Sequence, residues 1–197
     1  MRAAVLVSGG GTNLQALLDA RDDLGAELRV VVSNRADAFA LERARRAGVE
    51  AMCLSHKDFA TREDFDRALR DALLARGVEL VVLAGFMRVL TPVFLDAFPD
   101  RVINVHPALL PAFPGVDAQA QALAHGVKVT GCTVHLVDAG VDTGPILAQA
   151  AVPVRDDDTV ETLRARILVE EHRLLPAAVR DVAAGRVTRE GRRARVR

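Results

Sequence analysis

The sequence lacks several features that mark particular classes of protein. Its 197 residues include no Trp and no Tyr, and only 4% are aromatic. This removes the stacking surfaces on which proteins bind single-stranded nucleic acid. The 26 basic residues are balanced by 26 acidic residues, so no overall field attracts nucleic acid or an anionic membrane. We therefore expect neither nucleic acid nor a membrane as a partner.

Long apolar runs and paired cysteines are also missing. No apolar run approaches the length that spans a bilayer, and the chain opens on a strand-like run without a signal-peptide pattern. These absences predict a cytoplasmic protein. Cys53 and Cys132 are the only cysteines, and their separation matches no zinc or redox spacing. Each lies in an apolar, strand-like run, so we expect both to be buried and reduced.

The pattern of the N-terminal half predicts an α/β fold. Half of the residues are hydrophobic, enough for one substantial core, and the length favours a single domain over residues 1–197. Strand-like and amphipathic stretches alternate. The predicted strands lie at 3–8, 28–33, 50–54 and 80–85, and the predicted helices at 12–20, 36–47 and 62–76. This order indicates a mostly parallel, twisted sheet with helices on both faces.

The C-terminal half is less regular. A short helix is expected from Thr91-Pro92 to Phe98, and a proline-rich loop at 107–117. Strands are predicted at 101–106, 130–137 and 146–153, followed by a long helix at 159–184. Pro176 is expected to kink or split that helix. The arginine-rich residues 186–197 predict a solvated edge hairpin turning at Glu190-Gly191, with an RNA-binding tail as the alternative.

Three segments of unusual composition follow predicted strands, where open parallel sheets bind ligands. The first runs from Ser8 to Asn13, and its glycines let the backbone approach an anion at the start of a helix. We expect a phosphate there; a tight turn without a ligand is the alternative. Leu14 replaces the glycine of a dinucleotide-binding loop, and no Gly-Lys-Ser/Thr run marks a triphosphate site. Ser8 also lacks the Gly-x-Ser-x-Gly pattern of serine hydrolases.

The second and third segments carry groups suited to acyl transfer. Because strand side chains alternate, Asn104 and His106 share one face, where they can stabilise an oxyanion and transfer protons. A purely structural histidine is the alternative. In the turn at 138–144, Asp142 is expected to raise the pKa of His106 if the two side chains meet; otherwise it is a plain acidic turn residue. The five histidines show no metal-binding spacing, so no metal is predicted.

Five runs of sequence together carry a family resemblance. They are Val-Ser-Gly-Gly-Gly-Thr-Asn-Leu-Gln-Ala-Leu at 7–17, Ser-Asn-Arg-Ala-Asp-Ala at 33–38, Leu-Ala-Gly-Phe-Met-Arg-Val-Leu at 83–90, Ile-Asn-Val-His-Pro-Ala-Leu-Leu-Pro at 103–111, and residues 138–145. In this order and at these separations, they resemble the phosphoribosylglycinamide formyltransferase family of the purine pathway over nearly the whole chain. The chain departs from the family at Ala108, where serine is frequent, and at Ala112, where a basic or polar residue is common.

The resemblance implies a formyltransferase fold with a Rossmann-like N-terminal half. It places phosphate and nucleotide binding in residues 1–100, and catalysis and folate binding in residues 101–197. It further implies roles for individual residues. The catalytic residues would be Asn104, His106 and Asp142. Phosphoribosylglycinamide would be bound by Gly11, Thr12, Asn13 and Glu171. The 10-formyltetrahydrofolate would be bound by Arg62, Met87, Arg88, Val89, Leu90 and Asn104.

The implied reaction moves a formyl group from 10-formyltetrahydrofolate, as co-substrate, to the amine of glycinamide ribonucleotide in de novo purine biosynthesis. Asn104 and a protonated His106 would stabilise the oxyanion, and Asp142 would keep His106 protonated. A shared site is required, because direct transfer gains its rate from holding both reactants together. A homodimer is compatible with this scheme.

Other families share the Asn-x-His-Pro centre. Formyltetrahydrofolate hydrolase carries an additional N-terminal regulatory domain, methionyl-tRNA formyltransferase an additional C-terminal RNA-binding domain, and the chain length favours neither. Sugar-nucleotide formyltransferases also resemble the core, but the early glycine loop favours the glycinamide enzyme. An alternative of a different class is a non-catalytic phosphate- or folate-binding module, in which Asn104, His106 and Asp142 would be dispensable.

Overall fold

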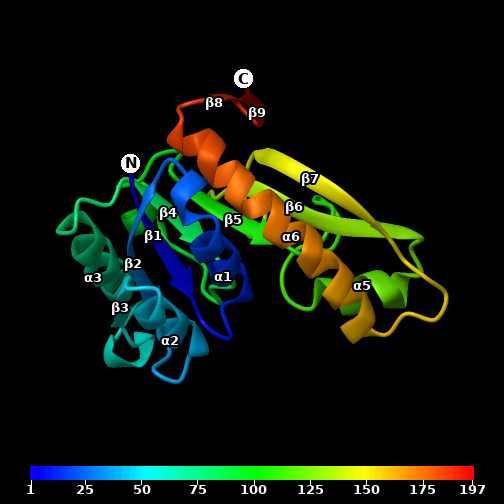
Figure 1. The fold of residues 1–197 in the computed structure, drawn as a ribbon, viewed down its shortest axis with the longest axis horizontal. Coiled ribbons are helices and arrows are strands. Elements are labelled where there is room, and N and C mark those ends of the chain that lie inside the picture. Colours follow the sequence, from blue (N-terminus) through cyan, green and yellow to red (C-terminus); the bar gives the residue numbers. More distant parts are fainter.

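The computed structural model describes residues 1–197, and seven of its strands form one sheet in the order β3-β2-β1-β4-β5-β6-β7 (Figure 1). A separate hairpin follows the last helix. The strands are β1 (Arg2–Val7), β2 (Glu27–Ser33), β3 (Glu50–Cys53), β4 (Leu80–Leu83), β5 (Val102–His106), β6 (Val129–Leu136), β7 (Ile146–Pro153), β8 (Val187–Glu190) and β9 (Arg193–Val196).

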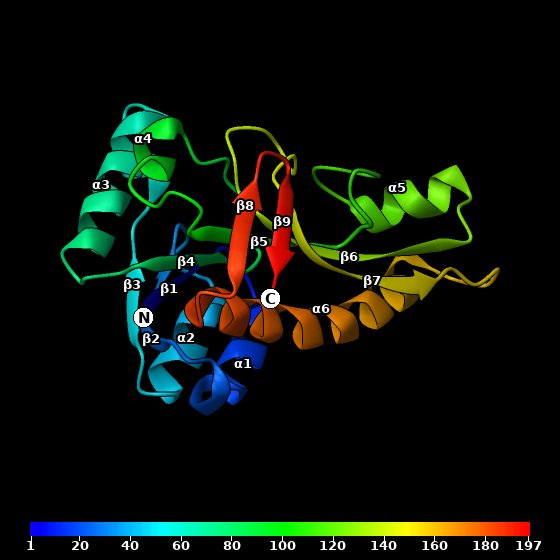
Figure 2. The same ribbon diagram turned by 90° about the horizontal axis from the view of Figure 1, so that it is seen from above.

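Helices cover both faces of the sheet, as the sequence pattern predicts. They are α1 (Thr12–Asp19), α2 (Phe39–Arg46), α3 (Arg62–Leu74), α4 (Pro92–Leu95), α5 (Ala118–His125) and α6 (Val160–Ala183), with 3-10 turns η1 (Arg21–Asp23) and η2 (His56–Asp58). Figure 2 shows α3 and α4 on one side of the sheet and α1, α2 and α6 on the other. One hydrophobic cluster lies on each face, which is the arrangement that buries a parallel sheet.

Strand pairing fixes the place of the functional site. β1 pairs in parallel with both β2 and β4, whereas β5–β6 and β6–β7 pair antiparallel. The chain winds outward from β1 to β3 and returns to β4 on the other side of β1. The carboxyl ends of β1 and β4 therefore flank the point where strand order reverses, and there the Ser8 amide donates to the Gly85 carbonyl at 3.1 Å.

Two predictions about helices are corrected by the structure. The sequence pattern did not indicate α5, an alanine-rich helix that buries Ala118 and Ala122 and ends at Gly126, whose φ is 74°. Pro176 does not split the predicted helix in two, because α6 runs unbroken from Val160 to Ala183. Buried residues on both sides of the proline pack on the sheet, and this packing holds the helix together without the missing backbone hydrogen bond.

The two cysteines differ in burial. Cys132 is buried in β6, as predicted, but Cys53 is exposed. The prediction for Cys53 is wrong because β3 is an edge strand, so an apolar run there need not be covered. None of the helices has the combined length and apolar character needed to cross a membrane.

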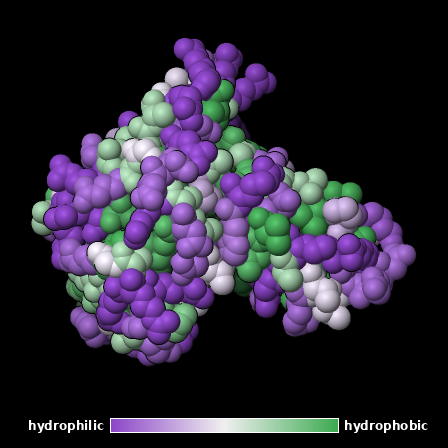
Figure 3. Space-filling model, in the orientation of Figure 1, coloured by the Kyte–Doolittle hydropathy of each residue, from purple (hydrophilic) through white to green (hydrophobic).

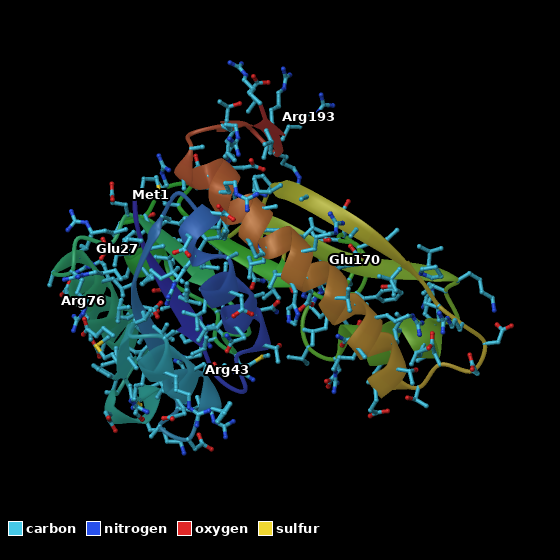
Figure 4. All side chains as sticks on the ribbon, in the orientation of Figure 1. Met1, Glu27, Arg43, Arg76, Glu170 and Arg193 are labelled. Atoms are coloured by element: carbon cyan, nitrogen blue, oxygen red, sulfur yellow. The ribbon has the colours of Figure 1, made fainter.

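The C-terminal hairpin forms as predicted, with the turn between Glu190 and Arg193. It protrudes from the body as a largely hydrophilic element at the top of Figure 3, and Figure 4 shows Arg193 at its outer end. Arg189 forms an ion pair with Asp100 at 2.7 Å, which ties the hairpin to the loop before β5. The hairpin is a separate two-stranded sheet and not an edge of the seven-stranded one.

Candidate active site

A cavity of about 830 Å³ opens at the carboxyl ends of β4 and β5. Its wall takes residues from both halves of the chain: the segment after β4, the end of β5, the 138–144 turn and the middle of α6. This is the edge at which open α/β sheets bind ligands. Among the predicted site residues, the wall brings together Asn13, Met87, Arg88, Val89, Leu90, Asn104, His106, Asp142 and Glu171.

The carboxamide, imidazole and carboxylate predicted for catalysis converge in this cavity. Asn104 and His106 both project from β5 toward the 138–144 turn, which carries Asp142. The Nδ1 atom of His106 lies 3.3 Å from Oδ2 of Asp142, and Nδ2 of Asn104 lies 3.4 Å from Oδ1 of the same carboxylate. Asp142 has a φ of 53°, a left-handed conformation that aspartate tolerates better than most residues.

His135 also belongs to this cluster, although sequence reasoning missed it. Antiparallel pairing sets His135 of β6 directly opposite Asn104, with its Nε2 atom 3.2 Å from Nδ2 of Asn104 and 3.5 Å from Oδ1 of Asp142. Its Nδ1 atom lies 2.8 Å from the Leu136 carbonyl and therefore donates the proton. The only signal in the sequence is a histidine inside an apolar strand, which does not reveal its partner strand.

The protonation of His106 differs from the expectation. Burial lowers the pKa of His106, and the nearby Phe113 carbonyl and Asp142 only partly oppose this effect. The expected rise in the His106 pKa is therefore wrong: the side chain is only 4% exposed, and desolvation of the imidazolium outweighs the attraction of the carboxylate. Its Nε2 atom lies 2.8 Å from the Phe113 carbonyl, so both ring nitrogens face acceptors.

Asp142 is held as a carboxylate. Burial by itself would raise its pKa, but hydrogen bonding by His135 and by the Gly115 amide, together with attraction by the imidazolium form of His106, lowers the pKa overall. The Gly115 amide donates to Oδ2 at 2.8 Å. Asp142 thus connects the 107–117 loop to Asn104, His106 and His135, and these four side chains form the β5 cluster. Asp142 retains its negative charge beside His106 at neutral pH.

The glycine loop meets α6 at another part of the wall. Asn13 donates through Nδ2 to Oε2 of Glu171 at 2.7 Å, and its Oδ1 atom is buried without a partner. Burial raises the pKa of Glu171, against the lowering effect of the Asn13 hydrogen bond. Two acceptors, the Asn13 oxygen and the Glu171 carboxyl, are therefore available to hydroxyl or amine donors of a ligand.

The rest of the loop is shaped by close contact with α2. Gly11 has a φ of 72°, and a Cβ atom placed there would lie 2.6 Å from Cβ of Ala40. The Arg43 side chain donates through Nε to the Gly10 carbonyl at 2.8 Å, and Figure 4 shows Arg43 beside this loop. Thr12 lines a second cavity, between α1 and α6, and Gly11 lines neither of the two cavities.

The segment predicted to hold folate forms a continuous part of the wall. Met87 is 70% exposed and Leu90 only 3%, so the segment passes from solvent into the core. Arg62 is the first residue of α3; it is exposed and does not line the cavity. No three His, Cys, Asp or Glu side chains are grouped so as to hold a metal ion.

Fold and site together are those of a formyl-group transferase, and comparison with known proteins agrees. A model of the formyl transferase family matches residues 1–179, so the chain belongs to this family. It is similar to the phosphoribosylglycinamide formyltransferase of Mycobacterium tuberculosis, with 52% identity over 98% of this chain and 90% of that protein.

Two further relatives extend the comparison. The chain is 57% identical to glycinamide ribonucleotide transformylase 1 from Symbiobacterium toebii, whose crystal structure it matches with a TM-score of 0.97 over 100% of this chain and 93% of that one. This confirms the predicted fold. The trifunctional purine biosynthetic protein adenosine-3 of Homo sapiens is 45% identical over 94% of this chain. The chain spans only 14% to 19% of the length of such trifunctional relatives.

Proposed function

We propose that this chain transfers the formyl group of 10-formyltetrahydrofolate to the amine of glycinamide ribonucleotide, a step of de novo purine biosynthesis in the cytoplasm. The observation that carries the proposal is the cluster of Asn104, His106 and Asp142 inside one large cavity. Membership of the formyl transferase family and similarity to named phosphoribosylglycinamide formyltransferases support the choice of substrates.

Two parts of the cavity wall suit the two substrates. Asn13 and Glu171 in the wall supply acceptors for donor groups of the nucleotide. The glycine loop before Asn13 lies next to this wall and supplies backbone amides at the start of α1, which attract a phosphate. The residues from Met87 to Leu90 offer apolar side chains to a pterin ring, and the amides from Arg88 to Leu90 are free to bind it. A cavity of about 830 Å³ has room for the reacting portions of both ligands.

The residues of the β5 cluster then perform the transfer. As the amine nitrogen bonds to the formyl carbon, the carboxamide of Asn104 donates a hydrogen bond to the developing oxyanion. His106, neutral because burial lowers its pKa, accepts the proton that the amine loses and delivers it to the departing nitrogen of the folate. Asp142, still ionised, stabilises the imidazolium between the two proton transfers.

His106 needs a free ring nitrogen for this role. Its Nδ1 atom faces Asp142 at 3.3 Å, and its Nε2 atom faces the Phe113 carbonyl at 2.8 Å. Nε2 is the atom that can turn to substrate, so the 107–117 loop has to release it first. Phe113 has a φ of 53°, a costly conformation for an aromatic residue, which favours its release.

The test is the absorbance change on deformylation of a 10-formylfolate, with and without glycinamide ribonucleotide, in wild type and His106→Ala. We expect turnover that requires the nucleotide and is lost in the variant, while the urea midpoint shows that the variant is folded. Turnover without the nucleotide would indicate a hydrolase. Tight binding of both ligands without any turnover would indicate a binding module, and either result would overturn the proposal.

A further inference from the structure

The segment from Phe86 to Thr91 borders the cavity without belonging to any helix or strand. Its backbone amides make only two hydrogen bonds, and both acceptors are side chains. The Met87 amide donates to Oγ of Ser8 at 2.9 Å. The Thr91 amide donates to Oδ2 of Asp66 at 2.6 Å. The three residues between these two points, together with Met87, line the cavity.

Ser8 holds the first end through a chain of hydrogen bonds. Its hydroxyl donates to Oδ1 of Asn34 at 2.6 Å, because an amide oxygen can only accept. The hydroxyl lone pairs are thereby directed at the Met87 amide. Nδ2 of Asn34 in turn lies 3.3 Å from Nδ1 of His56. Ser8 and Asn34 are each 5% exposed. Water therefore does not compete for these hydrogen bonds, and the Ser8 hydroxyl keeps its orientation.

Asp66 holds the second end from α3, and its position is unusual for an acid. The residue is 0% exposed, and it follows Phe65 on a helix that otherwise buries apolar side chains. The Thr91 amide is its only hydrogen-bond partner, and its Oδ1 atom has none. Burial of an apolar residue of similar size in α3 would be more favourable in free energy than burial of an unpaired carboxylate. Packing alone therefore does not account for Asp66.

The middle of the segment also packs against α3. The Arg88 guanidinium lies 4.9 Å above the ring of Phe65, which neighbours Asp66 in the sequence. The wall segment thus contacts the residue after β1 at one end, and α3 at the middle and the other end. Because its backbone lacks the internal hydrogen bonds of a helix or strand, its shape depends on these side chains.

We propose that Ser8 and Asp66 are positioning residues that fix the two ends of the 87–90 segment in the shape that binds folate. The inference rests on the proposed function, since it assigns folate to this segment. Neither side chain needs to touch substrate. Their effect is to limit the conformations of the wall before the ligand arrives, which lowers the entropy lost on binding.

Binding of tetrahydrofolate and of glycinamide ribonucleotide, each measured by calorimetry, tests the proposal. We expect Ser8→Ala and Asp66→Leu to raise the Kd of tetrahydrofolate about tenfold, equivalent to about 1.4 kcal/mol, and to change the Kd of the nucleotide less than about twofold. Asp66→Asn, which keeps an oxygen that can accept from Thr91, should restore most of the affinity. Equal losses for both ligands, or no loss for tetrahydrofolate, would overturn the inference.

Ser33→Ala is the matched control. Ser33 is a fully buried serine at the end of β2, and its hydroxyl donates to the Arg35 carbonyl at 2.8 Å without reaching the 87–90 segment. The control should lose stability as Ser8→Ala does and keep its affinity for tetrahydrofolate. A parallel loss of affinity in the control would mean that general destabilisation is responsible.

Hydrogen exchange in the ligand-free protein separates this inference from the proposed function. The Met87 and Thr91 amides should be protected in wild type, and each should exchange at least about tenfold faster when its own acceptor is removed. If wild type fails to bind tetrahydrofolate but these amides behave as expected, the proposed function is wrong, while Ser8 and Asp66 still fix the ends of the 87–90 segment. If exchange at both amides is unchanged in the variants, Ser8 and Asp66 do not fix the ends of the segment, and the inference is refuted whichever ligand the cavity binds.

Discussion

Replacement of Asp142 by asparagine removes one negative charge from the β5 cluster and little else. The carboxylate lies 3.3 Å from Nδ1 of His106 and accepts from the Gly115 amide at 2.8 Å. In Asp142→Asn the amide oxygen can take the place of Oδ2, where it still accepts from Gly115 and still faces Nδ1 of His106. The NH₂ group then takes the place of Oδ1, beside Asn104 and His135. The variant therefore keeps an acceptor for the proton on Nδ1 of His106, but it loses the negative charge that stabilises the imidazolium.

The size of the effect follows from the separation of the charges. At 3.3 Å, and with an effective dielectric constant of about 20, Coulomb's law gives about 5 kcal/mol between the carboxylate and the imidazolium. Asp142 is 11% exposed at its side chain, so water reduces this attraction, and we expect about 3 to 4 kcal/mol to be lost from the transition state. Because about 1.4 kcal/mol is a factor of ten, kcat should fall about 10²- to 10³-fold.

The assay is single-turnover formyl transfer at saturating concentrations of both substrates, which separates chemistry from binding. The Kd of tetrahydrofolate and the urea midpoint serve as controls, and both should stay near their wild-type values. A kcat within tenfold of wild type would refute the role of Asp142 as the stabiliser of a charged His106. A parallel collapse of stability would instead show that its bond to Gly115 maintains the fold of the loop.

Three further predictions concern other parts of the molecule. Gly11→Ala should lower the free energy of unfolding by about 1 to 3 kcal/mol in urea, because its new Cβ would lie 2.6 Å from that of Ala40 at a φ of 72°. Under native conditions a thiol reagent should titrate Cys53 alone, since burial raises the pKa of Cys132 to about 12, and should titrate both thiols in urea. The kcat/KM profile should fall on the acid side with its midpoint below 6.5, the usual histidine pKa, because burial lowers the pKa of the base His106. An acid-side midpoint above that value would refute the lowered pKa, and a fall on the alkaline side with the pKa of His106 would indicate that the protonated form is active.

The sequence predicted the fold and the centre of the site because their signals are local. Period-two and helical patterns mark the strands and helices of the N-terminal half, and the bounds in the structure differ from the predicted ones by a few residues. Alternation along β5 sufficed to put Asn104 and His106 on one face. The predicted helices lacked α5, because its alanines carry little amphipathic pattern, and Pro176 suggested a break that packing on both sides prevents.

What the sequence determined by itself was the order of elements, the glycine loop and the chemical groups available at the ends of the strands, since each depends on neighbours within a few residues. Only the tertiary structure decided which of those groups meet. Pairing of β5 with β6 brings His135 next to Asn104, and burial of the cluster lowers the pKa of His106 below its usual value. Both depend on contacts between distant parts of the chain and on the exclusion of water, which no local pattern specifies.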